Sequence, residues 1–327
     1  IELDQQDPDY SYVSKELEFL SKRGKSAAAL ILGKLYMRNI EGKLKRNFKL
    51  SSKSFNIAQR MKDPEALAYL SLFYYYGYKI VDFDFKKAAE LSYQSYSEGN
   101  MTGAAFYSEC LARGRGVEKN EELAVSIARE SSESKNSKGM NKYGLFLNQG
   151  IGNLSPNKKE AARLWKMSSE SGDAEGKFLY GSCLLEGGEY EVEKNPKKAI
   201  KYLEESIEGG CITAMAVLGQ LQIQGIYFDN DYDDSIVPDK NVMDGLKNIK
   251  EAADLGDDFA IIIYSNILAS KVDIDVDTYQ LSKYLKIGIK RQNIDCVSLF
   301  IKLREKGIIP FPTSISTDIE FYKKYCE

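Results

Sequence analysis

Histidine is absent from this chain of 327 residues. Without an imidazole the chain holds no Ser/His/Asp triad, no Cys/His dyad, no HExxH zinc helix and no zinc finger with histidine ligands. Carboxylates are plentiful, but nothing in the sequence brings two of them together as the acid and base of a hydrolase. We therefore expect a protein that is not an enzyme, with no catalytic residue and no cofactor.

Cysteine is scarce. The five cysteines are odd in number, are widely spaced and contain no CxxC pair: Cys110, Cys183, Cys211, Cys296 and Cys326. This pattern indicates neither a zinc site nor a disulfide framework. Free thiols are typical of a reducing compartment, so the composition favours the cytoplasm and leaves the endoplasmic reticulum lumen as the alternative.

An excess of one charge and a long apolar run are also missing. The chain has 45 Lys and Arg against 48 Asp and Glu, a net charge of −3, so it has no overall positive field for nucleic acid or an anionic membrane. The longest uninterrupted apolar run, Phe259 to Tyr264, is far shorter than the roughly 20 residues that span a bilayer. We expect neither nucleic-acid binding nor direct membrane insertion.

What the sequence does contain is an internal repeat. A small residue recurs every 36 to 38 positions, except for one interval of 46 between Gly219 and Ser265. This column reads Gly33, Ser71, Ser108, Gly144, Gly181, Gly219, Ser265 and Ile301. The regular spacing predicts one structural unit per period.

Neighbouring columns predict a helix around each of these small residues, which we name helix A. Five positions earlier the residues are again small, and one position earlier they are bulky, as in Tyr143 and Tyr180. Both offsets lie on one helical stripe, so helix A packs closely at the small residues and fills the core at the large ones. Six positions after the small residue, glycine is typical, and a glycine there ends the helix.

A second amphipathic segment, helix B, follows in each unit, as at residues 86–91, 158–165 and 197–203. Residues 12–23 have the pattern of a helix B without its helix A, and residues 318–325 that of a last helix B. Because the first residue is Ile1 and not methionine, we expect a fragment that starts in the middle of a unit. The predicted fold is an all-α, right-handed superhelical solenoid of seven to eight antiparallel helix pairs.

These blocks resemble the Sel-one-like repeat (SLR) family of tetratricopeptide-like solenoids. The resemblance is carried by segments such as 114–120, 180–188 and 245–256, covers roughly residues 12 to 326, and is weakest in the first and the last two units. It implies a single solenoid domain over residues 1–327. It also implies an adaptor or scaffold without catalytic activity, which binds a protein or peptide along the concave face that the helices A form.

Two glycine pairs could suggest a phosphate-binding loop. Gly114 and Gly116, like Gly150 and Gly152, lack the Gly-Lys-Ser/Thr sequence that follows in such loops, and they stand where a helix ends. We interpret them as helix caps. Trp165 lies on the apolar face of a helix B and is predicted to be core.

The interval of 46 residues contains an acidic insertion, residues 229–240. Asp229, Asp231 and Asp233 occupy the first ligand positions of a calcium loop, but Asp234 replaces its glycine and Lys240 its final glutamate. We interpret the insertion as a solvated loop. A calcium- or ligand-binding regulatory protein that uses these three aspartates remains the alternative function.

The resemblance places groove positions one, four and five residues after each small residue. These positions are mostly polar, and Leu72, Leu145 and Tyr76 are the exceptions. Exposed aromatics beside arginines are typical of binding hot spots. The predicted partner-binding residues are Arg38, Leu72, Tyr75, Tyr76, Arg113, Leu145 and Gln149. In the alternative interpretation, Tyr75 and Tyr76 cover a loop or a neighbouring side chain.

Overall fold

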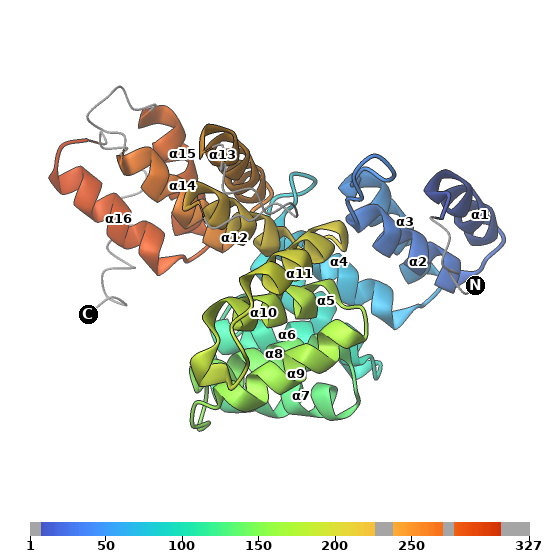
Figure 1. The fold of residues 1–327 in the computed structure, drawn as a ribbon. Helices are drawn as coiled ribbons and strands as arrows, with labels where there is room; N and C mark the ends of the chain where they lie inside the picture. Colours follow the sequence, from blue (N-terminus) through green and yellow to red (C-terminus); the bar gives the residue numbers. More distant parts are fainter. Residues whose placement is uncertain (1–7, 226–237, 271–277, 309–327) are drawn as a thin grey trace. The chain divides into compact units, whose positions relative to one another are not determined.

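The computed structural model describes residues 8–225, 238–270 and 278–308, and these residues fold into sixteen α-helices without a β-strand (Figure 1). In chain order the helices are α1 (Tyr10–Lys22), α2 (Ser26–Met37), α3 (Phe48–Arg60), α4 (Pro64–Tyr76), α5 (Phe85–Ser97), α6 (Met101–Arg113), α7 (Glu121–Glu133), α8 (Ser137–Gln149), α9 (Lys158–Glu170), α10 (Ala174–Glu186), α11 (Pro196–Glu208), α12 (Ile212–Ile223), α13 (Pro238–Asp254), α14 (Asp258–Ser270), α15 (Thr278–Lys290) and α16 (Ile294–Glu305). The prediction of an all-helical solenoid is confirmed.

Helices A and B alternate along the chain. The predicted small residues lie on the even-numbered helices, which are therefore helices A, and the odd-numbered helices are helices B. The chain divides into two compact units, residues 1–214 and 215–327. Consecutive helices pack against one another from α1 to α11 in the first unit and from α13 to α16 in the second. The prediction of a single domain over residues 1–327 stays a prediction, and each unit is described by itself.

Short polar residues begin the helices and glycines end them. The side chains of Asn47, Asp84, Asn120, Asn157 and Asn195 each accept a hydrogen bond from a backbone N–H in the first turn of a helix B. The predicted glycines follow helices A with positive φ angles, among them Gly114 (65°) and Gly150 (69°). The interpretation of the glycine pairs as helix caps is thus confirmed for the first glycine of each pair, Gly114 and Gly150.

The small residues mark the contacts between helices. A Cβ atom on Gly33 would lie 2.5 Å from the ring of Phe55 on α3, and one on Gly144 would lie against Nε1 of the Trp165 ring on α9 and 3.0 Å from its Cδ1 and Cε2. The small residue five positions earlier faces the preceding helix B instead, as Gly176 of α10 faces Ser168 of α9. Each helix A is therefore held between two helices B at two small residues.

A serine bridge fixes the contact between a helix A and the helix B that follows it. One serine near the end of a helix B donates a hydrogen bond to the first carbonyl of the preceding helix A. The pairs are Ser95 with Pro64 (2.6 Å), Ser131 with Met101 (2.7 Å), Ser168 with Ser137 (3.3 Å) and Ser206 with Ala174 (2.5 Å). These bonds tie each helix A to the helix B that follows it.

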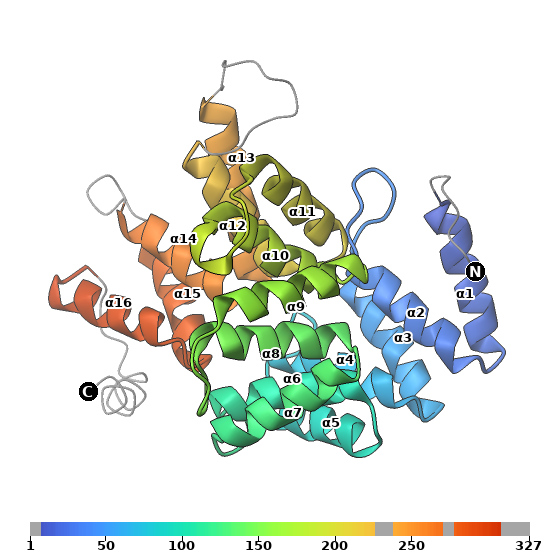
Figure 2. The ribbon, with the colours of Figure 1, turned by 60° about the horizontal axis from the view of Figure 1, so that its bottom comes forward.

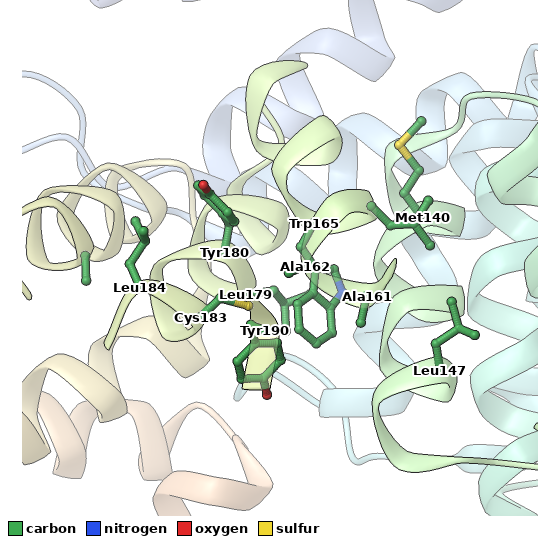
Figure 3. Close-up of a cluster of buried hydrophobic side chains, with 12 residues drawn as sticks. Met140, Leu147, Ala161, Ala162, Trp165, Leu179, Tyr180, Cys183, Leu184 and Tyr190 are labelled. Carbon is green, nitrogen blue, oxygen red and sulfur yellow. The ribbon is translucent and has the colours of Figure 1, made fainter. Parts of the chain in front are cut away.

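The core of unit 1 confirms the prediction for Trp165. Its indole is buried, lies 6.1 Å from the Tyr190 ring between centroids, and donates a hydrogen bond to the Asn141 carbonyl at 3.2 Å. Figure 3 shows it among Leu179, Ala162 and the other side chains of this cluster. The single tryptophan of the chain therefore reports on the contact between α8, α9 and α10.

In unit 2, α14 packs against α13, α15 and α16. Gly219 of α12 and Gly245 of α13 meet backbone to backbone, because a Cβ atom on either would lie 2.5 to 2.6 Å from the carbonyl oxygen of the other. Arg291, which directly follows α15, is fully buried and pairs with Asp258 at 2.5 Å. The left-handed position that Gly99, Gly172 and Gly256 have after other helices B is taken by the next residue, Gln292, with a φ of 63°.

Candidate functional site: the inner face of unit 1

The inner side of unit 1 is formed by helices A. α4 contacts α6, α6 contacts α8 and α8 contacts α10, whereas the helices B of the described residues make no comparable contacts with one another. In Figure 2, α8 lies between α9 on one side and α6 and α7 on the other. A stack that is tighter on one side curves toward that side, so the side chains that helices A turn toward one another form the concave face.

This face is crossed by a chain of ion pairs. Lys142 of α8 lies between two carboxylates, with its Nζ 2.8 Å from Glu109 Oε2 of α6 and 2.7 Å from Glu175 Oε1 of α10. Its side chain is only 6% exposed. Glu109 also accepts from Arg113 Nε (3.3 Å) and from the Tyr75 hydroxyl (3.4 Å). Three consecutive helices A are thereby joined through one buried ammonium group.

A second pair extends the chain toward the beginning of α10. Lys138 Nζ lies 2.8 Å from Asp173 Oδ2 and 3.9 Å from Glu175 Oε2. The other oxygen of Asp173, Oδ1, caps α10 by accepting from the N–H of Gly176 and also accepts from the Asn141 amide at 2.7 Å. The carboxylate that begins one helix A therefore fixes a lysine of the helix A before it.

On the other side of the face, Lys34 of α2 donates to Glu65 of α4 at 2.8 Å and lies 5.0 Å above the ring of Tyr69. Burial raises the pKa of the Tyr69 hydroxyl, and the positive charge of Lys138 opposes this rise, so the ammonium group of α8 acts on a side chain of α4. The concave face is thus filled with paired charges and is not an empty channel.

The charges of this network are fixed at neutral pH. Burial would by itself raise the pKa of Glu109, but Lys142 and Arg113 outweigh it and lower that pKa to about 2. Burial would likewise lower the pKa of Lys142, yet Glu109 and Glu175 hold it above its ordinary value. Neither group exchanges a proton near pH 7, so the network is suited to holding helices and orienting side chains.

The structure corrects the expectation that Tyr75 is exposed. Its side chain is only 5% exposed, and its hydroxyl accepts a hydrogen bond from Arg115 Nη1 at 2.8 Å. The Arg115 guanidinium lies 5.2 Å from the Tyr75 ring and 4.8 Å from the Phe85 ring, counted to the ring centroids. Arg115 is buried because it fills the space that Tyr75 and Phe85 enclose, and this pattern agrees with the alternative that the tyrosine covers a loop.

The other predicted residues divide into two groups. Tyr76 is half-buried between Tyr75 and Tyr78, and burial together with the Glu109 charge raises the pKa of its hydroxyl. Arg113, whose side chain is 51% exposed, and Gln149 reach solvent.

Leu72 and Leu145 are half-buried, and Arg38 is half-buried with its guanidinium 6.0 Å from the Tyr10 ring. The residue after Arg38 contacts a distant segment of unit 1, because the N–H of Asn39 donates to the Glu208 carbonyl at 3.1 Å. The end of α2 and the end of α11 are therefore in contact.

Lys142, the lysine at the centre of the network, was not predicted from the sequence. Lys142 stands two positions before the small residue Gly144, and the corresponding residues of the other units are all apolar or aromatic: Ile31, Tyr69, Phe106, Leu179, Val217, Ile263 and Leu299. A lone charge in an apolar column indicates a buried partner of opposite sign. That signal was present in the repeat alignment.

The residues of the alternative function lie outside the described part of the chain. This applies to Asp229, Asp231 and Asp233 of the acidic insertion, and to the last predicted helix B at residues 318–325. Within the described ranges, no three His, Cys, Asp or Glu residues are grouped so as to hold a metal ion. The helices of those ranges include none that is both long and apolar enough to cross a membrane.

Comparisons with known proteins agree with this fold. The family model of the Sel1 repeat matches four consecutive segments, residues 64–100, 102–136, 137–173 and 174–211, which together run from α4 to the loop after α11. These segments are Sel1 repeats. A search of curated proteins finds no match.

Solved structures of Sel1 repeat proteins are similar to the chain at low identity. A Sel1 repeat protein from Oxalobacter formigenes has 20% identity and a TM-score of 0.44, over 75% of this chain and 97% of that one. One from Klebsiella pneumoniae has 19% identity and a TM-score of 0.42, over 62% and 95%. A protective antigen of uropathogenic Escherichia coli strains, which displays an SLR fold, has 15% identity and a TM-score of 0.38, over 89% and 67%.

Proposed function

We propose that this chain, whose residues 64–211 are four Sel1 repeats, is a non-catalytic scaffold that binds a protein or peptide partner on the concave face of unit 1. Sel1 repeats generally mediate protein interactions, and solenoids present extended surfaces with little chemistry of their own. The observation that carries the proposal is the row of Tyr76, Arg113 and Gln149, which lies at one register position on α4, α6 and α8.

The buried ion pairs hold side chains of this row in place. Arg113 is held by Glu109, which is itself held by Lys142, so the guanidinium is oriented before a partner arrives. Preorganised side chains lose less conformational entropy on binding. The half-buried Leu72 and Leu145 add apolar area beside the row, and Arg38 adds a second cation. A partner with a carboxylate close to an apolar anchor fits these groups.

The test is to isolate a partner by affinity purification from the native source and to measure its affinity for variants. Tyr76→Ala and Arg113→Ala should each weaken binding by about 2 kcal/mol, roughly 30-fold, because both remove centrally placed contacts. Lys197→Ala, an exposed lysine at the start of α11 on a helix B, is the matched control and should leave binding unchanged.

Circular dichroism melts separate a lost contact from a lost fold. If both variants bind normally, or if Tyr76→Ala binds weakly only because it melts early, the partner surface lies elsewhere on the chain.

A further inference from the structure

The first helix pairs differ from the rest of the chain in charge. Residues 8–62, which end just before α4, contain thirteen Lys and Arg against four Asp and Glu. The seven residues before them carry three acidic side chains, and the chain as a whole has a net charge of −3. The positive charge of this protein is therefore concentrated on α1, α2, α3 and their loops, while the later repeats are acidic.

On α1 and α3 the basic residues follow one pattern. The two helices are one repeat apart, because their capping residues Asp9 and Asn47 are 38 positions apart. Three and ten positions after each cap stands an apolar residue, and six and thirteen positions after it stands a basic one. On α1 these residues are Tyr12, Lys15, Phe19 and Lys22, and on α3 they are Leu50, Lys53, Ile57 and Arg60. We call these eight residues the α1/α3 face.

The α1/α3 face is open to solvent. Tyr12 is 62% and Phe19 51% exposed, and the other residues of the face are exposed except for Ile57, which is half-buried. Lys15, Lys53 and Arg60 form no ion pair with the described residues, in contrast to the fully paired lysines of the concave face. Four large apolar side chains and three uncompensated cations thus lie on the solvent-exposed sides of two consecutive helices B.

The same positions of the later helices B in unit 1 do not repeat this pattern. They read Lys87, Glu90, Gln94 and Ser97 on α5, Leu123, Ser126, Glu130 and Glu133 on α7, Glu160, Arg163, Met167 and Glu170 on α9, and Lys198, Lys201, Glu205 and Glu208 on α11. The packing of the solenoid therefore does not require apolar and basic residues there. The pattern belongs to α1 and α3 alone among these helices, which indicates a role specific to this end of unit 1.

The spacing also defines the shape of the pattern. Seven residues are nearly two helical turns, so the two apolar residues of each helix form one strip along its axis, and the two basic residues form a second strip about 60° around the helix. Because α1 and α3 share a register, each of the two helices carries one apolar and one basic strip. A partner that lies along the helices would meet an apolar strip on one side and a basic strip on the other.

We propose that the α1/α3 face docks an amphipathic, acidic α-helical segment of a partner protein. Such a helix has its own apolar residues at intervals of seven, which match the apolar strips, and its carboxylates would pair with Lys15, Lys53 and Arg60. This proposal deepens the scaffold function, on which it rests, and adds a second surface on the outer side of the repeats.

Charge favours a protein segment over a membrane or a nucleic acid. An anionic bilayer is an extended surface, and it would also meet the later helices B, where Glu130, Glu133 and Glu170 are exposed at the corresponding positions. A single helix covers only the strips of α1 and α3. Repulsion from the rest of the chain is therefore smaller for a helix than for a polyanion of large area.

The test is a selection of helical peptides on the full chain. A display library of 20-residue helix-forming peptides is expected to yield binders with acidic residues and apolar residues seven apart. Lys15→Glu combined with Lys53→Glu should weaken the selected peptides at least tenfold, and Phe19→Ala should weaken them as well. Lys201→Glu is the matched control, because Lys201 is the exposed lysine at the same register position of α11, and it should leave binding unchanged.

Two results would overturn the proposal. The first is that no helix is recovered, or that the recovered helices bind the Lys15→Glu/Lys53→Glu variant as tightly as the unmodified chain. The second is that phosphatidylcholine vesicles with 30% phosphatidylserine, or a 20-base-pair DNA duplex, bind in a manner that this variant abolishes while no helix is recovered. If a partner bound at the concave face still binds this variant, only the outer surface is disproved and the scaffold function stands.

Discussion

Replacing Lys142 with methionine is expected to lower the free energy of unfolding of unit 1 by about 3 to 5 kcal/mol at pH 7. The ammonium group neutralises Glu109 and Glu175 at 2.8 and 2.7 Å, and its removal leaves two largely buried carboxylates without their shared cation. Methionine fits the site by shape, since Phe106 and Leu179 stand at the same register position of neighbouring helices A. The loss would therefore report the charge and not a packing defect.

The effect should depend on pH in a defined direction. The pKa of Glu109 is lowered to about 2 in the folded chain, so its ionised form stabilises the fold above the ordinary value of 4.5, and this contribution disappears as the pH falls from 4.5 toward 2. In the Lys142→Met chain this stabilisation is already weakened. The difference between the two proteins should thus be largest at neutral pH and should shrink below pH 4.5.

Urea unfolding followed by Trp165 fluorescence measures this difference, because the only tryptophan lies in the same unit and bonds to the Asn141 carbonyl on α8. Lys177→Met is the control. Lys177 pairs with Glu205 at 2.6 Å, but the side chains are 23% and 37% exposed, so the loss should stay below about 1 kcal/mol. Equal losses in the two variants, or a Lys142→Met loss that does not change with pH, would contradict the ion-pair explanation.

The repeat could be predicted from sequence because each column repeats one physical requirement. Gly33, Gly144 and Gly181 recur where helix A meets the following helix B, and the capping glycines recur where a left-handed residue is needed. A requirement that recurs in every unit is visible as a period. The helix order, the small-residue contacts and the core position of Trp165 were all predictable for this reason.

The concave site was predictable only in part because its chemistry occurs once. Lys142 has no equivalent in the other repeats, and its partners Glu109 and Glu175 stand 33 positions before and after it in the sequence. Tyr75 was expected on the surface because no local pattern shows that Arg115, in the loop after α6, returns to cover it. Side-chain pairs between different repeats do not recur at a fixed interval. A single sequence therefore predicts the helices that form the concave face but not the side-chain contacts on it.

Gly139→Val is expected to destabilise unit 1 by about 3 kcal/mol, at the upper end of the usual overpacking range. Gly139 of α8 faces the serine bridge, and a Cβ atom there would lie 2.5 Å from the carbonyl carbon of Ser131 on α7. Backbone cannot rotate away as a side chain can, so α7 and α8 must separate. Ser131 also donates to the Met101 carbonyl of α6 at 2.7 Å, so a shift of this serine would disturb that hydrogen bond as well.

A graded comparison separates this contact from a general cost of replacing glycine in a helix. Gly181→Ala adds a Cβ atom 3.3 Å from the Ala199 carbonyl and from Tyr202 Cβ, a spacing that small shifts relieve, so the loss should stay below about 1 kcal/mol. Ser131→Ala removes the bridge without a clash and should cost about 1 kcal/mol. Urea midpoints followed by Trp165 fluorescence should rank Gly139→Val well below both. If Gly139→Val unfolds together with Gly181→Ala, then α7 and α8 are not in close contact at this residue, and the period of small residues does not mark where helices meet.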